Sequence, residues 1–111
     1  MKIEQVQHGT VLVLVPDGAL IEDDAQDFAR QVRDCLLSGH NKLIIQLNNV
    51  PFIDSAGLET LLVLFGEAMA QGGEIKISTP TDIGRDILKA TRLNHVIEVH
   101  SSTPDARRSF V

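Results

Sequence analysis

Two almost wholly apolar runs in the first half of the chain each have the length of a buried β-strand. They are Thr10–Val15 and Leu43–Leu47, and such continuous runs are typical of strands that are covered on both faces. Before the first run, Lys2–Gln7 alternates loosely between polar and apolar residues and is followed by His8-Gly9. The close spacing across this glycine predicts a hairpin, with the initial strand at or near an edge of the sheet.

Helices are predicted where apolar residues recur at spacings of three and four. Acidic residues favour a helix start and glycines favour a helix end, which sets several of the boundaries. Two further strands, Glu74–Ser78 and His95–Val99, are predicted between the later helices. The first two predicted helices run from Glu22 to before Ser38 and from Ala56 to about Gln71. The third begins at Thr81-Asp82 and has Ile83, Ile87, Leu88 and Leu93 as its apolar stripe. The fourth begins at Ser102 and has Pro104 at its first position.

From Thr10 onward, strands and helices alternate four times. This order predicts an α/β fold with a mostly parallel central sheet of about five strands and about four helices. A chain of 111 residues has the length of one domain, so we expect a single domain over residues 1–111.

Composition and charge exclude several classes of function. A formal net charge of −5 argues against a nucleic-acid partner, which requires a basic surface. Cys35 is the only cysteine, so an internal disulfide and a multi-cysteine metal site are both excluded. No apolar run approaches the ~20 residues that span a bilayer, and the start Met1–Gln5 is too polar for a signal peptide. We therefore expect a cytoplasmic protein without a membrane span.

Four patterns could suggest chemistry, but each has a simpler structural explanation. The acidic residues around Glu22 suit a solvated helix start. Gly72-Gly73 ends a helix instead of opening a phosphate loop, because no Lys-Ser or Lys-Thr pair follows it. Cys35 is adjacent to the apolar helical position Leu36, so we expect inert packing. The four histidines lack a paired ligand spacing, and we predict no metal site, no cofactor and no catalytic residue.

The stretch Phe52–Leu58 is the strongest candidate for function, because its loop delivers a serine to the first turn of a helix. Simple N-capping by Asp54 or Ser55 explains the residue types. A hydrolase nucleophile is a poor interpretation, because Ile53 stands where the Gly-x-Ser-x-Gly motif has its first glycine, and the sequence places no histidine as a base. The amides and dipole of a helix start would, however, stabilise a phosphate on such a serine.

The residues Asp54-Ser55-Ala56-Gly57-Leu58 follow a predicted buried strand and begin a helix. In this context they resemble the Asp-Ser-x-Gly-Leu signature of the STAS domain, the fold of bacterial anti-sigma factor antagonists. The resemblance extends over nearly the whole chain. The other similar positions are Val11–Val15 with Gly18, Leu43–Leu47 with Val50, Phe52 and Ile53, Gly72–Ile77, Pro80, Leu88, Leu93 and Val96-Ile97.

This resemblance implies partner switching by a binding protein that is not an enzyme. The unphosphorylated form would dock on an anti-sigma factor that is itself a serine kinase, and thereby free the sigma factor. The kinase would phosphorylate Ser55 and end docking, and a PP2C-type phosphatase would restore it. ATP and magnesium would belong to the kinase, so the chain itself needs no cofactor.

The partner surface implied by the resemblance centres on the serine and the loop beside it. Three positions depart from the family pattern: Ile21 stands where Asp is common, Gln46 where Asp or Asn is common, and Arg92 where glycine is common. Ile21 gives the neighbouring loop an apolar contact. The predicted partner-binding residues are Gly18, Ile21, Asp23, Asp24, Asp54, Ser55, Ala56, Gly57 and Leu58.

Two alternatives to the switch hypothesis follow from the same residues. One is a structural STAS subunit that is held permanently in a larger assembly, such as a stress-sensing complex or a lipid-transport ATPase complex. Such a subunit has no chemical need for an exposed hydroxyl, so the presence of both Asp54 and Ser55 favours the switch. The other alternative, a small hydrolase that uses Ser55, lacks a base.

Overall fold

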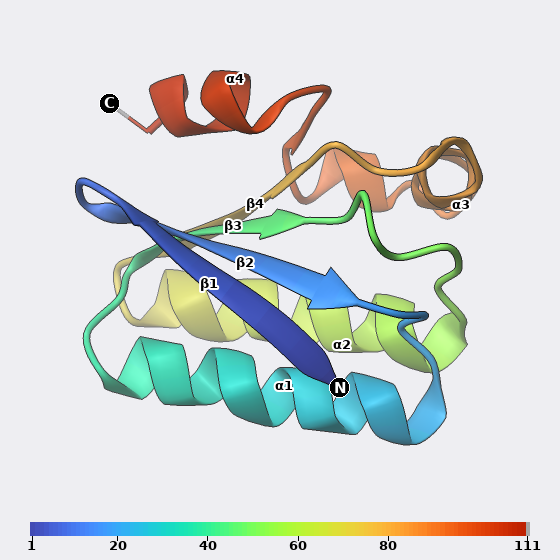
Figure 1. Ribbon diagram of the computed structural model, residues 1–111, viewed down its shortest axis with the longest axis horizontal. Helices are drawn as coiled ribbons and strands as arrows, with labels where there is room; N and C mark the ends of the chain where they lie inside the picture. Colours follow the sequence, from blue (N-terminus) through green and yellow to red (C-terminus); the bar gives the residue numbers. More distant parts are fainter. Residues whose placement is uncertain (111) are drawn as a thin grey trace.

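A mixed five-stranded sheet forms the centre of the molecule in the computed structural model, which describes residues 1–110 (Figure 1). The strands lie in sequence order, and only the first pair is antiparallel. The predicted hairpin across Gly9, with its first strand at an edge, is therefore confirmed. The strands are β1 (Lys2–His8), β2 (Val11–Asp17), β3 (Lys42–Gln46), β4 (Glu74–Ser78) and β5 (Val99–His100).

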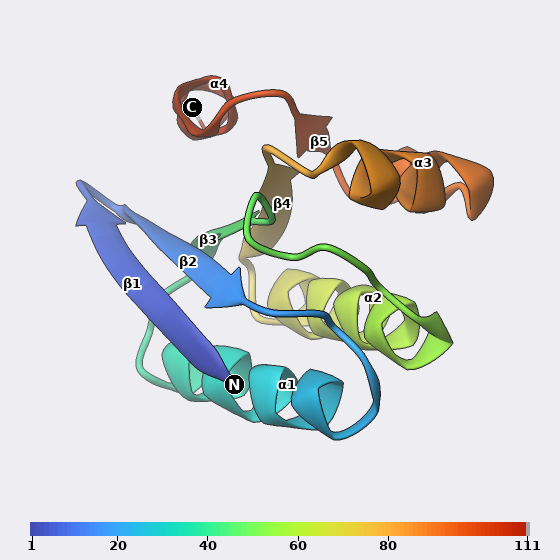
Figure 2. The ribbon, with the colours of Figure 1, turned by 45° about the vertical axis from the view of Figure 1, so that its right-hand side comes forward.

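Four α-helices connect and cover the strands. Helices α1 and α2 lie side by side against one face of the sheet, and α4 lies on the opposite face (Figures 1 and 2). Helix α3 leads from β4 to the edge strand β5. The predicted fold class is thus confirmed. The helices are α1 (Glu22–Leu37), α2 (Ser55–Ala70), α3 (Asp82–Ala90) and α4 (Thr103–Arg108), with a 3₁₀ turn η1 (Leu93–His95).

The apolar strand β2 is buried on both faces, as its continuous apolar sequence predicts. Leu12 and Leu14 pack into the main core between the sheet and helices α1 and α2. Val13 faces the other way, into a second cluster that contains Ala106 of α4. The short helix α4 therefore closes an apolar face that would otherwise be open to water.

The predicted strand His95–Val99 is wrong over most of its length. Arg92 has φ of 61°, in the left-handed region that favours glycine. The chain then tightens into η1, where the N–H groups of His95 and Val96 donate to the carbonyls of Arg92 and Leu93. Only Val99–His100 remains extended beside β4.

The predicted apolar stripe of α3 is only partly correct. Leu88 is buried within the helix, and Leu93 is buried beyond its end, in η1. Ile83, which the spacing places on the buried stripe, is 59% exposed at the start of the helix. A nine-residue helix at the edge of the sheet has less apolar surface to cover than the spacing implies.

Polar groups hold α4 against the sheet, an arrangement that the sequence analysis did not predict. Lys76 on β4 is only 3% exposed, and its Nζ donates to Ser109 Oγ at 2.7 Å and to Ser109 O at 3.1 Å. The same ammonium lies 4.3 Å from the ring centroid of Phe110 and 3.3 Å from a carboxylate oxygen of Glu98. The buried charge is therefore both hydrogen-bonded and paired, as burial requires.

A second polar network lies at the start of α4. The Thr103 hydroxyl lies 2.7 Å from that of buried Ser78 and donates to Gln46 Oε1 at 2.8 Å. Gln46, at the end of β3, thus helps to position α4.

Candidate functional site

Ser55 is the first residue of α2, and its side chain is exposed. Asp54, not Ser55, is the N-cap, because its Oδ1 accepts a hydrogen bond from the Gly57 N–H at 2.8 Å. The capping question left open by the sequence is thereby answered. The serine hydroxyl is not needed to cap the helix and is free to react or to contact a partner.

Asp54 also contacts the start of the other long helix. The N-cap position of α1 is Ile21, which has no side chain that can accept a hydrogen bond. Instead, Asp54 Oδ2 accepts from the backbone N–H of Glu22 at 3.3 Å. A single carboxylate therefore satisfies backbone donors at the starts of both α1 and α2.

The loops that precede α1 and α2 are paired by backbone hydrogen bonds. Gly18 N–H donates to Asn49 O at 3.0 Å, Leu20 N–H donates to Phe52 O at 3.0 Å, and Asp54 N–H donates back to Leu20 O at 3.2 Å. This pairing continues the contact between parallel strands β2 and β3 beyond their ends. It brings the segment that carries Gly18 next to the segment that carries the serine.

Gly57 allows the first turn of α2 to approach these loops closely. A Cβ at this position would lie 2.2 Å from Leu20 O and 2.8 Å from Ile53 Cγ2. Gly18 has φ of 120°, a conformation that side chains other than glycine rarely adopt. Both glycines of the predicted site thus have a backbone role in its construction.

A groove of about 780 Å³ runs between α1 and α2 beside the serine. Glu22, Asp23 and Gln26 form part of the α1 wall, and Ala56 and Glu59 begin the α2 wall. Of the acidic residues predicted to contact a partner, Asp23 lines this groove, whereas Asp24 is exposed on the same helical turn without lining it.

An ion pair joins the two walls farther along the helices. Arg33 donates from Nε and an amino group to the two carboxylate oxygens of Glu67, at distances of 2.9 Å and 3.0 Å. The hydrogen bonds to Glu67 raise the pKa of the Arg33 guanidinium above its ordinary value. Sequence reasoning included Asp23 and Ala56 but missed Gln26 and Arg33, because nothing local indicates which exposed helical residues face each other.

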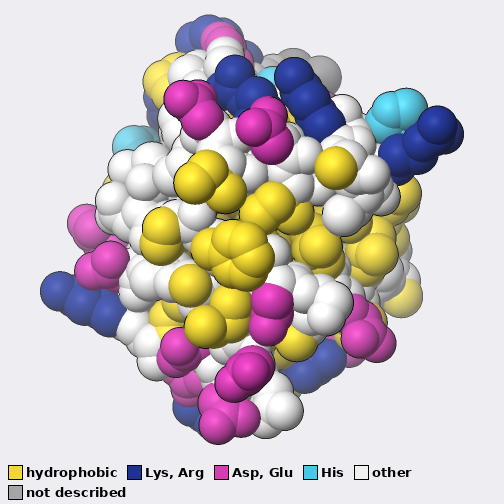
Figure 3. All heavy atoms as spheres, turned by 90° about the vertical axis from the view of Figure 1, so that its right-hand side faces the viewer, with side chains coloured by type: hydrophobic (Ala, Val, Ile, Leu, Met, Phe, Trp, Pro, Cys, Tyr) yellow, Lys and Arg dark blue, Asp and Glu magenta, His cyan; other side chains and the backbone are white. Residues whose placement is uncertain are grey.

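Apolar side chains are also exposed in the loop before α2 and on the helices α2 and α3. Phe52 in the loop before α2 is 49% exposed, Leu62 on α2 is 41% exposed, and Ile83 on α3 is 59% exposed. Figure 3 shows the end of the molecule that lies at the right of Figure 1, with hydrophobic side chains grouped in the middle and acidic side chains near them. The half-buried Ile21 and Leu58 belong to the same end of the sheet. An exposed aromatic residue in the loop was the available signal for this surface, but the sequence analysis did not include Phe52 among the partner-binding residues.

The groove beside Ser55 offers no histidine among its lining residues. Within residues 1–110, no group of three or more His, Cys, Asp or Glu side chains is placed to hold a metal ion. Over the same residues, no helix is both long and apolar enough to cross a bilayer.

Comparison with known proteins identifies the family. A family model of the STAS domain matches residues 2–106. This chain belongs to the STAS domain family. The family suggested by the Asp-Ser-x-Gly-Leu stretch together with the positions along the rest of the chain is therefore confirmed.

Several proteins that this STAS domain resembles are described as anti-sigma factor antagonists. A "putative anti-sigma factor antagonist" of Thermotoga maritima is 26% identical over 97 residues, which cover 86% of each chain. The crystal structure of a protein with that description from the same organism has a TM-score of 0.90 at 23% identity and covers 96% of this chain and 92% of that one.

The anti-sigma factor antagonist SpoIIAA also has the same fold. Its unphosphorylated form has a TM-score of 0.79 at 16% identity, over 99% of each chain. Its phosphorylated form, from Bacillus, has a TM-score of 0.72 at 15% identity, over 99% of this chain and 100% of that one. This STAS domain therefore has the fold of an anti-sigma factor antagonist.

Proposed function

We propose that this STAS domain is a phosphorylation-controlled partner-switching protein. In the proposed cycle, the unphosphorylated form binds a serine-kinase anti-sigma factor in the cytoplasm, the kinase phosphorylates Ser55, and docking ends. A PP2C-type phosphatase then restores the binding form. The observation that carries the proposal is an exposed Ser55 hydroxyl at the start of α2, released from capping by Asp54.

The position of Ser55 suits a reversible phosphate. A phosphoserine carries about −1.5 to −2 charges at neutral pH. At the start of α2, the helix dipole and unpaired backbone N–H groups offset its repulsion from Asp54. The domain should therefore remain folded after modification.

The surroundings of Ser55 suit a partner that distinguishes the two states. Exposed Phe52 supplies apolar area in the loop that carries the serine, and apolar area that leaves water favours association. A phosphate within such an interface would lose its hydration without a matched charge, which costs at least several kcal/mol. Because ~1.4 kcal/mol is a tenfold change in affinity, docking should fall by orders of magnitude.

The proposed partner surface includes the paired loops as well as the serine. Gly18 and Ile21 belong to the loop that is hydrogen-bonded to the serine-bearing loop, and Asp23 begins the groove wall. Phe52 is added to the predicted set on the ground of its exposure. The proposed surface comprises Gly18, Ile21, Asp23, Asp24, Phe52, Asp54, Ser55, Ala56, Gly57 and Leu58.

The experiment measures binding of Ser55→Ala and Ser55→Asp to the cognate kinase by calorimetry, with phosphorylation followed by mass spectrometry. Ser55→Ala should bind like the unmodified protein and accept no phosphate at this position. Ser55→Asp should bind at least tenfold more weakly, although one carboxylate has less charge than a phosphate. Thr10→Asp is the matched control, because Thr10 is exposed in the β1–β2 turn at the opposite end of β2; it should bind normally.

Equal affinities of the Ala and Asp variants would contradict the switch. A protein that forms a stable complex irrespective of the state of Ser55 would instead be a structural STAS subunit. Loss of binding by Thr10→Asp as well would show that added charge alone, independent of position, weakens docking.

A further inference from the structure

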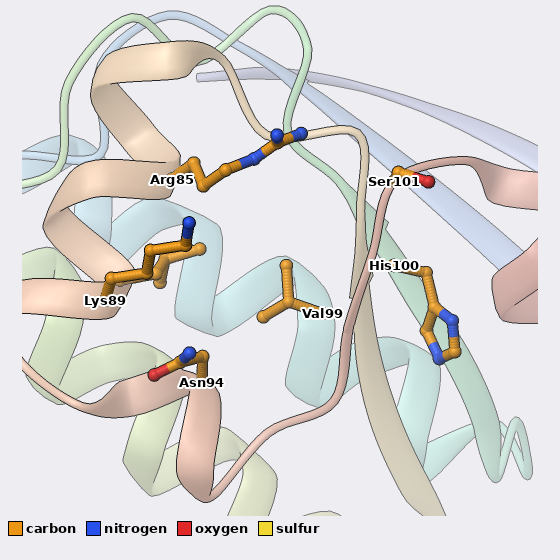
Figure 4. Close-up of a pocket in the computed structure, with 7 residues that line it drawn as sticks. Arg85, Lys89, Asn94, Val99, His100 and Ser101 are labelled. Atoms are coloured by element: carbon orange, nitrogen blue, oxygen red, sulfur yellow. The ribbon is translucent and has the colours of Figure 1, made fainter.

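A second hollow lies away from Ser55, between α3, η1 and the edge strand β5. Its volume is about 300 Å³, which is at the lower end of the range for small-molecule sites. Arg85, Leu88 and Lys89 of α3 line one side of the hollow, and β5 lines the other side. Asn94 of η1 also lines it. Figure 4 shows Arg85, Lys89 and Asn94 along the helical side, with Val99 facing them from the strand.

Two cationic side chains meet at this hollow without a carboxylate partner. Arg85 and Lys89 are four residues apart and so share one face of α3. Across residues 1–110, the ion pairs within 4.0 Å involve neither of them. Like charges at this spacing repel each other, so an anion between them would remove an unfavourable interaction.

His100 is not counted with these cations. It belongs to the wall of the hollow, but its ring points away on the far side of β5 in Figure 4. Its Nε2 lies 3.0 Å from a carboxylate oxygen of Glu98. The positive charge that faces the hollow therefore comes from α3 alone.

The hollow offers further donors beside the two cations. The Asn94 side chain points toward Lys89 and can donate two hydrogen bonds. On β5, the carbonyls of Glu98 and His100 face β4, where they accept from Ile77 and Thr79. Backbone groups alternate between the two edges of a strand, so the N–H and the C=O of Val99 both face the open edge and offer it one donor and one acceptor.

The rest of the lining is mixed, because Ser101 adds a hydroxyl to the apolar side chains of Leu88 and Val99. Leu88 is 1% exposed and forms the floor together with half-buried Val99. The guanidinium, ammonium and amide together supply more donors than the about four lone-pair sites of a carboxylate accept, and so suit the three terminal oxygens of a phosphate ester. The apolar floor suits an organic body about the size of one ring.

We propose that this hollow binds a small phosphomonoester. Arg85 and Lys89 hold the phosphate, Asn94 and the edge of β5 complete its hydrogen bonds, and Leu88 and Val99 contact the organic part. The hollow is separate from the serine switch in that none of its lining residues belongs to the proposed partner surface.

The experiment is a titration of the ¹⁵N-labelled protein with phenyl phosphate, followed by ¹H–¹⁵N correlation spectra, with phenol and inorganic phosphate as comparison ligands. We expect saturable shifts at Arg85–Lys89, Asn94 and Val99 in the millimolar range or below. Inorganic phosphate should bind several-fold more weakly because it lacks the apolar part. Phenol should produce no saturable shift because it lacks the charge.

Arg85→Gln and Lys89→Gln should each weaken phenyl phosphate binding about tenfold or more, since hydrogen bonds between charged groups are the strong ones. Arg107→Gln on α4 removes the same charge at a distance and should leave the affinity unchanged. The spectra of each variant also show directly whether it is folded. The proposal is overturned by unchanged affinity in both α3 variants, by phenol shifting the same residues to the same extent, by equal or tighter binding of inorganic phosphate, or by the absence of saturation at 20 mM.

Discussion

Replacing Gly57 with alanine adds a single Cβ atom where the first turn of α2 meets the loop before α1. The added Cβ would lie 2.2 Å from the Leu20 carbonyl oxygen, 2.8 Å from Ile53 Cγ2 and 3.1 Å from the Leu20 carbonyl carbon. Leu20 and Ile53 are 0% and 2% exposed, so neither can move outward without disturbing the core. The backbone of α2 or of the β2–α1 loop must shift instead.

The expected destabilisation follows from three contributions. Overpacking of this kind costs typically about 1–3 kcal/mol. A shift of Leu20 also weakens the hydrogen bond that its carbonyl accepts from Asp54 N–H at 3.2 Å, worth about 1 kcal/mol. The higher helix propensity of alanine returns at most about 1 kcal/mol. We therefore expect Gly57→Ala to lower the free energy of unfolding by about 2–3 kcal/mol.

The same helix offers a matched control. A Cβ at Gly66 would have no neighbour within 4 Å, and this residue lies in the interior of α2. Gly66→Ala should therefore raise the free energy of unfolding by about 0.5–1 kcal/mol, through helix propensity and the reduced freedom of the unfolded chain.

Urea unfolding followed by circular dichroism measures both variants under one set of conditions. The two free energies should differ by about 3 kcal/mol, and the melting temperatures by roughly 10 °C for a domain of this size. The reasoning is refuted if Gly57→Ala unfolds within about 0.5 kcal/mol of the unmodified protein. That result would mean that the loop relaxes freely around α2.

Two further predictions concern the attachment of α4 and the acid side of the stability curve. Lys76→Met removes the donor to Ser109, so amide exchange in α4 should accelerate at least tenfold; unchanged exchange would show that apolar contacts alone hold the helix. Burial of Glu98 opposes its ionisation, but the hydrogen bond with His100 and the charge of Lys76 outweigh burial and hold the pKa of Glu98 below its ordinary value of 4.5. Its stabilising contribution is thus fully present above about pH 4.5 and is lost as the pH falls through the lowered pKa. Glu98→Gln should make the urea midpoint less dependent on pH below 4.5. An unchanged pH dependence of the midpoint in this range would contradict the prediction.

The elements that sequence reasoning placed correctly are those whose burial can be read from the apolar pattern of neighbouring residues. The apolar run of β2 and the spacing of Phe28 and Val32 on α1 each reflect direct contact with the core. The start of α2 could be predicted because capping depends on residues within one turn. Asp54 and Gly57 are three residues apart and form that cap.

The features that were missed depend on residues far apart in the sequence. Lys76 stands between two isoleucines in a short strand, so nothing local indicates that Ser109 will satisfy its buried charge. The strand predicted from His95 failed because Arg92 adopts a left-handed backbone, which a sequence pattern favours only for glycine. The ion pair between the two walls of the groove joins Arg33 on α1 and Glu67 on α2, which lie 34 positions apart in the sequence.

The shared carboxylate of Asp54 has a mechanical consequence for the groove. It links the first turn of α2 to the first turn of α1 through Gly57 and Glu22, while Arg33 and Glu67 link the same helices farther along. These two polar links thus connect α1 and α2 at the serine end of the groove and farther along it. Any change that draws Asp54 away from Glu22 removes one of these two polar links and leaves the Arg33–Glu67 ion pair as the other. The width of the groove at its serine end is therefore set by the residue immediately before the serine.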